Sequence, residues 1–155
     1  MKSDNQELAA LAASALVNLC NYSPDIKEIF FQKGGLNVLL EYLTCKREII
    51  LLNVLRLIQV FIAKSETFTK KICEENEQEA VKSLLNILHG PGLRNTSYST
   101  QVSHRVLIIL RQMIRFSVTA KATILERRDA LEAIINKVKP EALHTVAASL
   151  EICIY

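Results

Sequence analysis

Residues that interrupt helices are scarce in this chain, which contains four glycines and three prolines among 155 residues. Half of the residues are hydrophobic. A chain of this length and hydrophobicity can bury a core as one domain. The composition is typical of a compact all-α protein.

Aromatic residues and net charge are also limited. Tryptophan is absent and 6% of the residues are aromatic, which argues against a surface that stacks nucleic-acid bases. The formal net charge of +3 is small. It would tolerate acidic partners but falls short of the charge typical of nucleic-acid-binding domains.

The four cysteines are too far apart for any C-x-x-C pair; they are Cys20, Cys45, Cys73 and Cys153. This spacing argues against a zinc site made of local pairs. A chain with this much core does not need a disulfide framework, and three of the four cysteines lie in or beside apolar runs. We therefore predict buried, reduced thiols, no metal site, and a cytoplasmic or nuclear protein.

A long hydrophobic run is missing as well. The longest apolar stretch, residues 49–63, contains Asn53, Arg56 and Gln59, so it is too short and too polar to span a bilayer. The first residues, MKSDNQE, lack the hydrophobic segment of a signal peptide. We expect no membrane insertion.

Motifs for catalysis are not found. The three histidines are far apart, and no H-x-x-x-H, G-x-S-x-G, phosphate-loop or dinucleotide-binding pattern occurs. One acidic run, at residues 74–79, is better explained as charge at a helix junction than as paired catalytic carboxylates. We expect no enzymatic activity and no cofactor.

Helical periodicity is abundant, because apolar residues recur at three- and four-residue spacing along most of the chain. Ser23 and Pro24 predict a helix start, Gly34 and Gly35 predict its end, and Ser65 is a candidate N-cap. The segment 90–101 (GPGLRNTSYSTQ) is predicted to be a polar loop. The predicted helices cover residues 4–21, 24–32, 36–43, 48–64, 66–74, 79–89, 102–117, 119–126, 130–138 and 140–155.

The medium-length helices repeat one apolar pattern. The pattern reads Leu36, Leu39, Leu40 and Leu43, then Val81, Leu84, Leu85 and Leu88, then Leu131, Ile134, Ile135 and Val138. The second interval is longer because the 90–101 loop is inserted there. A period of about 40–50 residues with three helices per unit is typical of armadillo and related repeats.

The segments ALVNLC (15–20) and KGGLNVLLEYL (33–43) resemble the armadillo repeat. The resemblance implies a right-handed α-solenoid of about three armadillo-like repeats, spanning 1–155 as a single domain. The Gly-Gly turn occurs only once, so a HEAT-like or irregular solenoid is an alternative to regular armadillo repeats. Because the apolar end ICIY (152–155) lacks a polar cap, we expect a fragment of a longer protein or an end that packs on something else.

Armadillo proteins hold an extended peptide in a concave groove lined by the third helices, and asparagines in the motif matching ALVNLC clamp its backbone. The resemblance therefore implies a scaffold that binds an extended or helical segment of a partner protein. Alignment of the long helices places Asn18, Gln59 and Gln112 in register as an amide ladder; the alternative is three unrelated polar residues.

Basic residues gather in the C-terminal half, where Arg105, Arg111 and Arg115 are the groove candidates. They would favour an acidic peptide, and the alternative is a solvated helix face. Two other functions stay open. One is an oligomerisation module whose terminal helices pair with another copy or with the rest of a longer chain. The other is a nucleic-acid-binding solenoid, against which the lack of interleaved aromatic residues argues.

Overall fold

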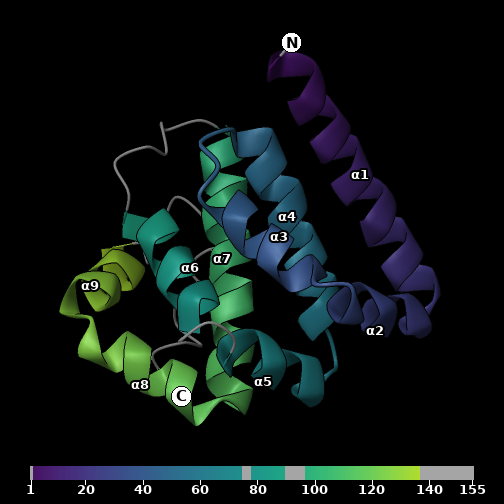
Figure 1. Cartoon of the computed structure of the whole chain (residues 1–155). Helices are drawn as coiled ribbons and strands as arrows, with labels where there is room; N and C mark the ends of the chain where they lie inside the picture. The colour runs from purple at the N-terminus through teal and green to yellow at the C-terminus, as the bar shows by residue number, and fades with distance from the viewer. Residues whose placement is uncertain (1, 75–77, 90–96, 137–155) are drawn as a thin grey trace.

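A computed structural model describes residues 2–74, 78–89 and 97–136 (Figure 1). All regular secondary structure in these ranges is helical, which confirms the all-α class. The helices are α1 (Lys2–Tyr22), α2 (Pro24–Gln32), α3 (Gly35–Leu43), α4 (Glu48–Ile62), α5 (Glu66–Glu74), α6 (Glu79–His89), α7 (Ser97–Phe116), α8 (Val118–Glu126) and α9 (Arg128–Asn136). The helix predicted over 140–155 lies outside the described residues.

The largest difference between a predicted and an observed helix boundary is at the start of α7. Helix α7 begins at Ser97, so residues 97–101 of the predicted loop are helical, and the rest of that loop lies outside the described residues. The polar composition of this segment favoured a loop. Ser99 is nevertheless buried, which means that packing against neighbouring helices continues α7 beyond the point where its apolar pattern begins.

Local signals set most of the other helix ends. Gly34 has a positive φ of 74°, which glycine adopts without strain, and its N–H closes α2 by donating to the Phe31 carbonyl. Ser65 caps α5 by accepting from the Phe68 N–H at 3.2 Å, as predicted. Ser23 is the N-cap of α2 with Pro24 at the first helical position, as predicted, although its side chain makes no capping hydrogen bond.

Helices three places apart in the chain pack against each other. The long helices α1, α4 and α7 form one row, with α4 between the other two, and α3, α6 and α9 form a second row. Helix α5 contacts α8, and α2, α5 and α8 lie along the lower edge in Figure 1. Long, short and medium helices follow one another three times along the chain. Helices of the same length class therefore lie next to each other in space.

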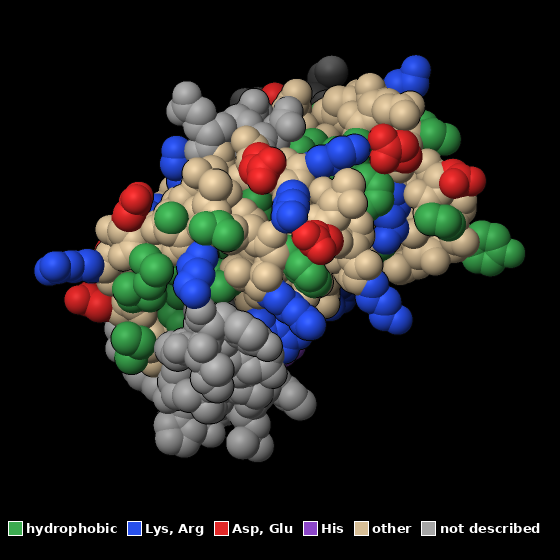
Figure 2. Space-filling model, turned by 90° about the horizontal axis from the view of Figure 1, so that it is seen from below, with side chains coloured by type: hydrophobic (Ala, Val, Ile, Leu, Met, Phe, Trp, Pro, Cys, Tyr) green, Lys and Arg blue, Asp and Glu red, His purple; other side chains and the backbone are tan. Residues whose placement is uncertain are grey.

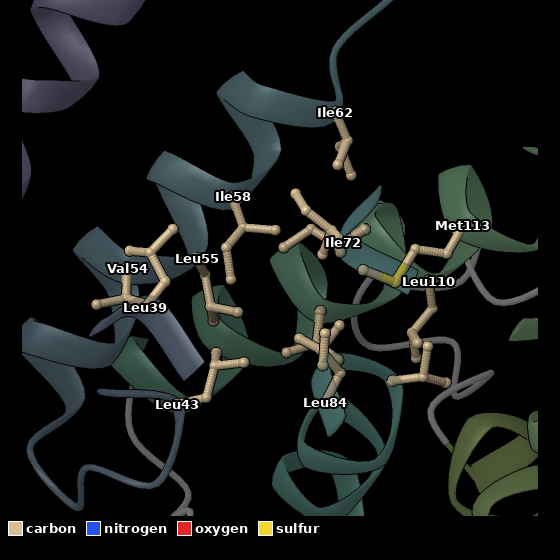
Figure 3. Packing of buried hydrophobic residues seen from close by; sticks show 14 of the residues in the cluster. Leu39, Leu43, Val54, Leu55, Ile58, Ile62, Ile72, Leu84, Leu110 and Met113 are labelled. Atoms are coloured by element: carbon tan, nitrogen blue, oxygen red, sulfur yellow. The ribbon is translucent and has the colours of Figure 1, made fainter. Parts of the chain in front are cut away.

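The hydrophobic core is centred on α4. Nine of its fifteen residues are buried, because α1 covers one side and α7 the other. A helix whose sequence is apolar on nearly every side requires cover on more than one side, and α4 has it. Figure 3 shows the converging side chains: Leu39 and Leu43 from α3, Val54, Leu55, Ile58 and Ile62 from α4, Ile72 from α5, Leu84 from α6, and Leu110 and Met113 from α7.

Four aromatic rings join α2, α4 and α5. Phe61 of α4 lies between Phe30 and Phe31 of α2, with ring centroids 5.0 and 5.2 Å away. Phe68 of α5 stacks on Phe31 at 5.0 Å. Lys71 lies within cation–π range of the Phe31 and Phe68 rings, which places a charge at the solvent edge of the cluster.

The Gly35→Ala substitution should lower the free energy of unfolding by about 1–3 kcal/mol. A Cβ at this position would overlap the Phe30 ring, and that ring is held against Phe61. Urea denaturation followed by circular dichroism measures the change. In a Phe30→Ala background the cost of Gly35→Ala should shrink, since the overlap is gone. Equal costs in both backgrounds would rule out this explanation.

Candidate functional site

The three long helices share one solvent-facing surface. On α4, Glu48 at the first position is half-buried, and beyond it the accessible positions recur at helical spacing: Ile49, Asn53, Arg56, Gln59 and Val60. On α7 they are Arg105, Ile108, Gln112 and Arg115, and the polar side of α1 adds Glu7, Ser14 and Asn18. We call these residues the long-helix face.

Polar contacts join the three helices across the long-helix face. The Asn53 side-chain amide donates to the Ala10 carbonyl of α1 at 3.3 Å, and Arg56 donates to the Asn53 side-chain oxygen at 3.4 Å. On the other side of α4, Arg105 Nη1 donates to Gln59 Oε1 at 2.7 Å. These groups are partly buried, so they hold the side chains in defined positions on the surface.

Positive charge is concentrated at the centre of this face. Burial lowers the pKa of Arg105, and the nearby charge of Arg56 lowers it further. Neither the α4 positions nor the α7 positions of the face include an aspartate or a glutamate. The two guanidinium groups therefore repel each other, and the one carboxylate of the face, Glu7, belongs to α1.

The surface along α2, α5 and α8 differs in charge pattern. Figure 2 looks onto this side and shows acidic and basic side chains interspersed among hydrophobic ones. Two ion pairs lie on these helices, Lys70–Glu66 at 2.7 Å and Lys71–Glu28 at 3.5 Å. Opposite charges are thus matched there, whereas α4 and α7 present only arginines on the long-helix face.

An apolar hollow adjoins the long-helix face where α1 meets the start of α4. Its volume is about 410 Å³, and its lining is mostly apolar: Ala10 and Leu11 from α1, Ile49 and Ile50 from α4, with Glu7 and Arg47 completing it. The Leu11 and Ile49 side chains are 68% and 54% exposed. The hollow is large enough to accept an aliphatic or aromatic side chain.

The structure brings together two of the predicted groove residues, Gln59 and Arg105. Gln112 is half-buried on the same side of α7 as Arg105, and Asn18 is exposed on α1. Among the described residues, no hydrogen bond links the three amides of the predicted ladder; the Gln59 oxygen is taken by Arg105 instead. The amide ladder stays a prediction.

The other two predicted arginines lie near the end of α7. The Arg115 guanidinium lies over the Phe116 ring, 5.4 Å from its centroid. Arg111 is half-buried at the border of the face. Sequence reasoning had not included Asn53 and Arg56 among the candidates. The sequence did contain a sign of this exposed side, because the polar residues Asn53, Arg56 and Gln59 recur every three residues in a helix that is otherwise mostly apolar.

Within residues 2–74, 78–89 and 97–136, no group of three or more His, Cys, Asp or Glu side chains is placed to hold a metal ion. None of the helices described is both long enough and apolar enough to cross a membrane. Cys20 and Cys73 are buried and Cys45 is half-buried, all as free thiols, while Cys153 lies outside the described residues.

Comparisons with known proteins leave the family open. No protein family matches the chain, and neither a curated protein nor a solved structure is significantly similar to it.

Proposed function

We propose that this chain is a non-enzymatic scaffold of armadillo-like repeats, stacked as a right-handed α-solenoid, that binds an acidic segment of a partner protein along the long-helix face. Two observations support the repeat arrangement: the period in the sequence, and the contacts between helices three places apart. By the armadillo resemblance, the groove belongs to the third helices, which here are α1, α4 and α7.

The pair of arginines at the centre of the face carries the proposal. Arg56 and Arg105 lie close enough for their charges to interact, and the α4 and α7 positions of the face include no acidic residue. An incoming aspartate or glutamate would relieve this repulsion and accept charge-assisted hydrogen bonds. The bond from Arg105 to Gln59 holds the guanidinium in place, so less side-chain entropy is lost on binding.

The apolar hollow adds a second requirement for the partner. Ile49, in the hollow, and Arg56 are seven residues apart on α4, which corresponds to about 10 Å along the helix axis. An extended peptide covers that distance in about three residues. The partner segment should therefore carry an apolar side chain about three positions from an acidic one.

A selection from a random peptide library displayed on phage would test this. Enriched peptides should contain Asp or Glu about three positions from an aliphatic or aromatic residue. Binding of a synthetic enriched peptide, measured by fluorescence polarisation, should weaken by about 10–100-fold in Arg56→Gln/Arg105→Gln, the effect of losing hydrogen bonds to charged groups.

The matched control is Lys70→Gln/Lys82→Gln, which removes the same charge from exposed positions on α5 and α6. If both double variants lose affinity equally, net charge rather than the face is responsible. Selected peptides without acidic residues would contradict the proposal. A single-stranded oligonucleotide that binds more tightly than the peptides, with steep salt dependence, would replace it with nucleic-acid binding.

A further inference from the structure

Helix α1 presents a second apolar side that nothing in the described structure covers. Its inner side, with Ala13 and Cys20 buried, packs towards α4 and α2. The opposite side carries six exposed apolar residues, which we call the outer face of α1: Leu8, Leu11, Ala12, Ala15, Leu19 and Tyr22. At 3.6 residues per turn they fall within an arc of about 100°. The exposed fractions of Leu8 and Tyr22 are 63% and 94%.

The charge pattern of α1 matches that of an interface. Residues 8–24 include no Lys, Arg, Asp or Glu, although one whole side of this segment is open to solvent. A helix that only faces water normally carries charges there. Among the long helices that the structure describes, α4 has one on each side, whereas α1 has one on its inner side alone. A contiguous apolar surface of this kind marks an interaction site.

The order of residues on the outer face indicates what covers it. Leu8 and Tyr22 are each seven residues from Ala15, on opposite sides, and Leu11 and Leu19 are each four residues away. A twofold interface requires that if one residue contacts a second, the second also contacts the first. An antiparallel helix pair centred on Ala15 meets this condition.

We infer that a second copy of this chain covers the outer face, in an antiparallel pair of α1 helices related by a twofold axis at Ala15. Leu8 of each copy then lies over Tyr22 of the other, and Leu11 over Leu19. The small side chain of Ala15 at the axis lets the two backbones approach closely. No charges meet, because the paired segments contain none.

This pairing shares Leu11 with the proposed peptide site and places Ala12 opposite Asn18, but it does not involve Arg56 and Arg105. Asn18 and Ser14 belong to the polar side of α1, next to the outer face rather than on it. Leu11 lies at the border and also lines the apolar hollow, so it is left unchanged in the test. The variants that test self-association (Leu8 and Leu19) and peptide binding (Arg56 and Arg105) change different residues, so failure of one proposal can be distinguished from failure of the other.

Light scattering over a concentration series tests the association. The wild type should reach twice the 17.5 kDa mass of the chain, and Leu8→Glu/Leu19→Glu should stay monomeric while keeping its helical circular dichroism. The matched control, Val118→Glu/Leu125→Glu, places the same charges on exposed positions of α8 and should dimerise like the wild type. A wild type that is monomeric at every concentration overturns the inference and leaves the outer face to a different protein.

Cysteine cross-linking tests the register without relying on charged variants. In a Cys45→Ser/Cys153→Ser background, mild oxidation should cross-link Ala15→Cys to itself, because both copies meet at the axis. Ser14→Cys, on the adjoining polar side, should remain monomeric under the same conditions. Leu8→Cys should cross-link only when mixed with Tyr22→Cys. Self-cross-linking of Leu8→Cys would indicate a parallel pair and overturn the antiparallel geometry.

Discussion

The Phe61→Ala substitution is expected to lower the free energy of unfolding by about 3–5 kcal/mol. The Phe61 ring is fully buried and contacts rings from two other helices: Phe30 and Phe31 of α2, and Phe68 of α5. Removing it opens a cavity at the junction of three helices, which cannot close without moving one of them. Since domains are typically stable by about 5–15 kcal/mol, the change removes a large part of the total.

Chemical denaturation followed by circular dichroism measures this loss. Phe68→Ala is the matched control, because Phe68 belongs to the same cluster but is only half-buried. It should cost clearly less than Phe61→Ala, since fewer contacts and less buried area are lost. If the order of the two costs is reversed, the aromatic cluster is not centred on Phe61.

The thiol of Cys73 should be almost inert in the folded protein. Burial raises its pKa to about 12, opposing a smaller lowering effect from the hydrogen bond with Ser117. At pH 8 the thiolate is the reactive form, and its fraction at this pKa is about 1,000-fold smaller than for a thiol with the ordinary value. Alkylation by iodoacetamide, read by mass spectrometry, should modify Cys73 about 1,000-fold more slowly in buffer than in denaturant.

The same thiol makes stability depend on pH. As pH rises, the unfolded chain loses the Cys73 proton near the ordinary pKa of 9.0, whereas the folded chain keeps it to about 12. The stabilisation is therefore complete below pH 9 and is lost progressively between pH 9 and pH 12. Between pH 8 and pH 10.5 the loss should be about 2 kcal/mol.

Comparison with Cys73→Ala isolates this contribution from other groups that titrate in alkali. The free energy of unfolding of the wild type should fall by about 2 kcal/mol more than that of the variant over the same pH range. The comparison also removes the effect of Cys20, whose pKa burial raises in the same direction. Equal slopes for the two proteins would contradict the assignment.

Helix positions were largely predictable from the sequence because their signals are local. Spacing of apolar residues, the Ser23-Pro24 start and the Gly34-Gly35 end each depend on neighbours within one or two turns. The start of α7 was missed for the opposite reason. The segment around Ser99 is polar, as loops are. The helix nevertheless extends back to Ser97, because Ser99 is buried against other helices.

The functional surface was predictable only in part. The sequence named Gln59 and Arg105 separately, but their contact joins residues 46 positions apart and depends on how α4 packs against α7. The closeness of Arg56 to Arg105 has the same origin. Electrostatic interaction depends on distance in space, and in the sequence these residues look like ordinary interruptions of apolar helices.

Helix α1 shows most clearly which features follow from the sequence and which follow from helix packing. Its sequence alone shows that apolar residues lie on two sides of the helix, since the angle between side chains follows from local helical geometry. It does not show which side is buried. Packing against α4 covers the side of Ala13 and Cys20 and leaves the side of Leu8 and Tyr22 in solvent. Which apolar side remains available for a partner is a property of helix packing, because burial is determined by contacts between segments that are distant in the chain.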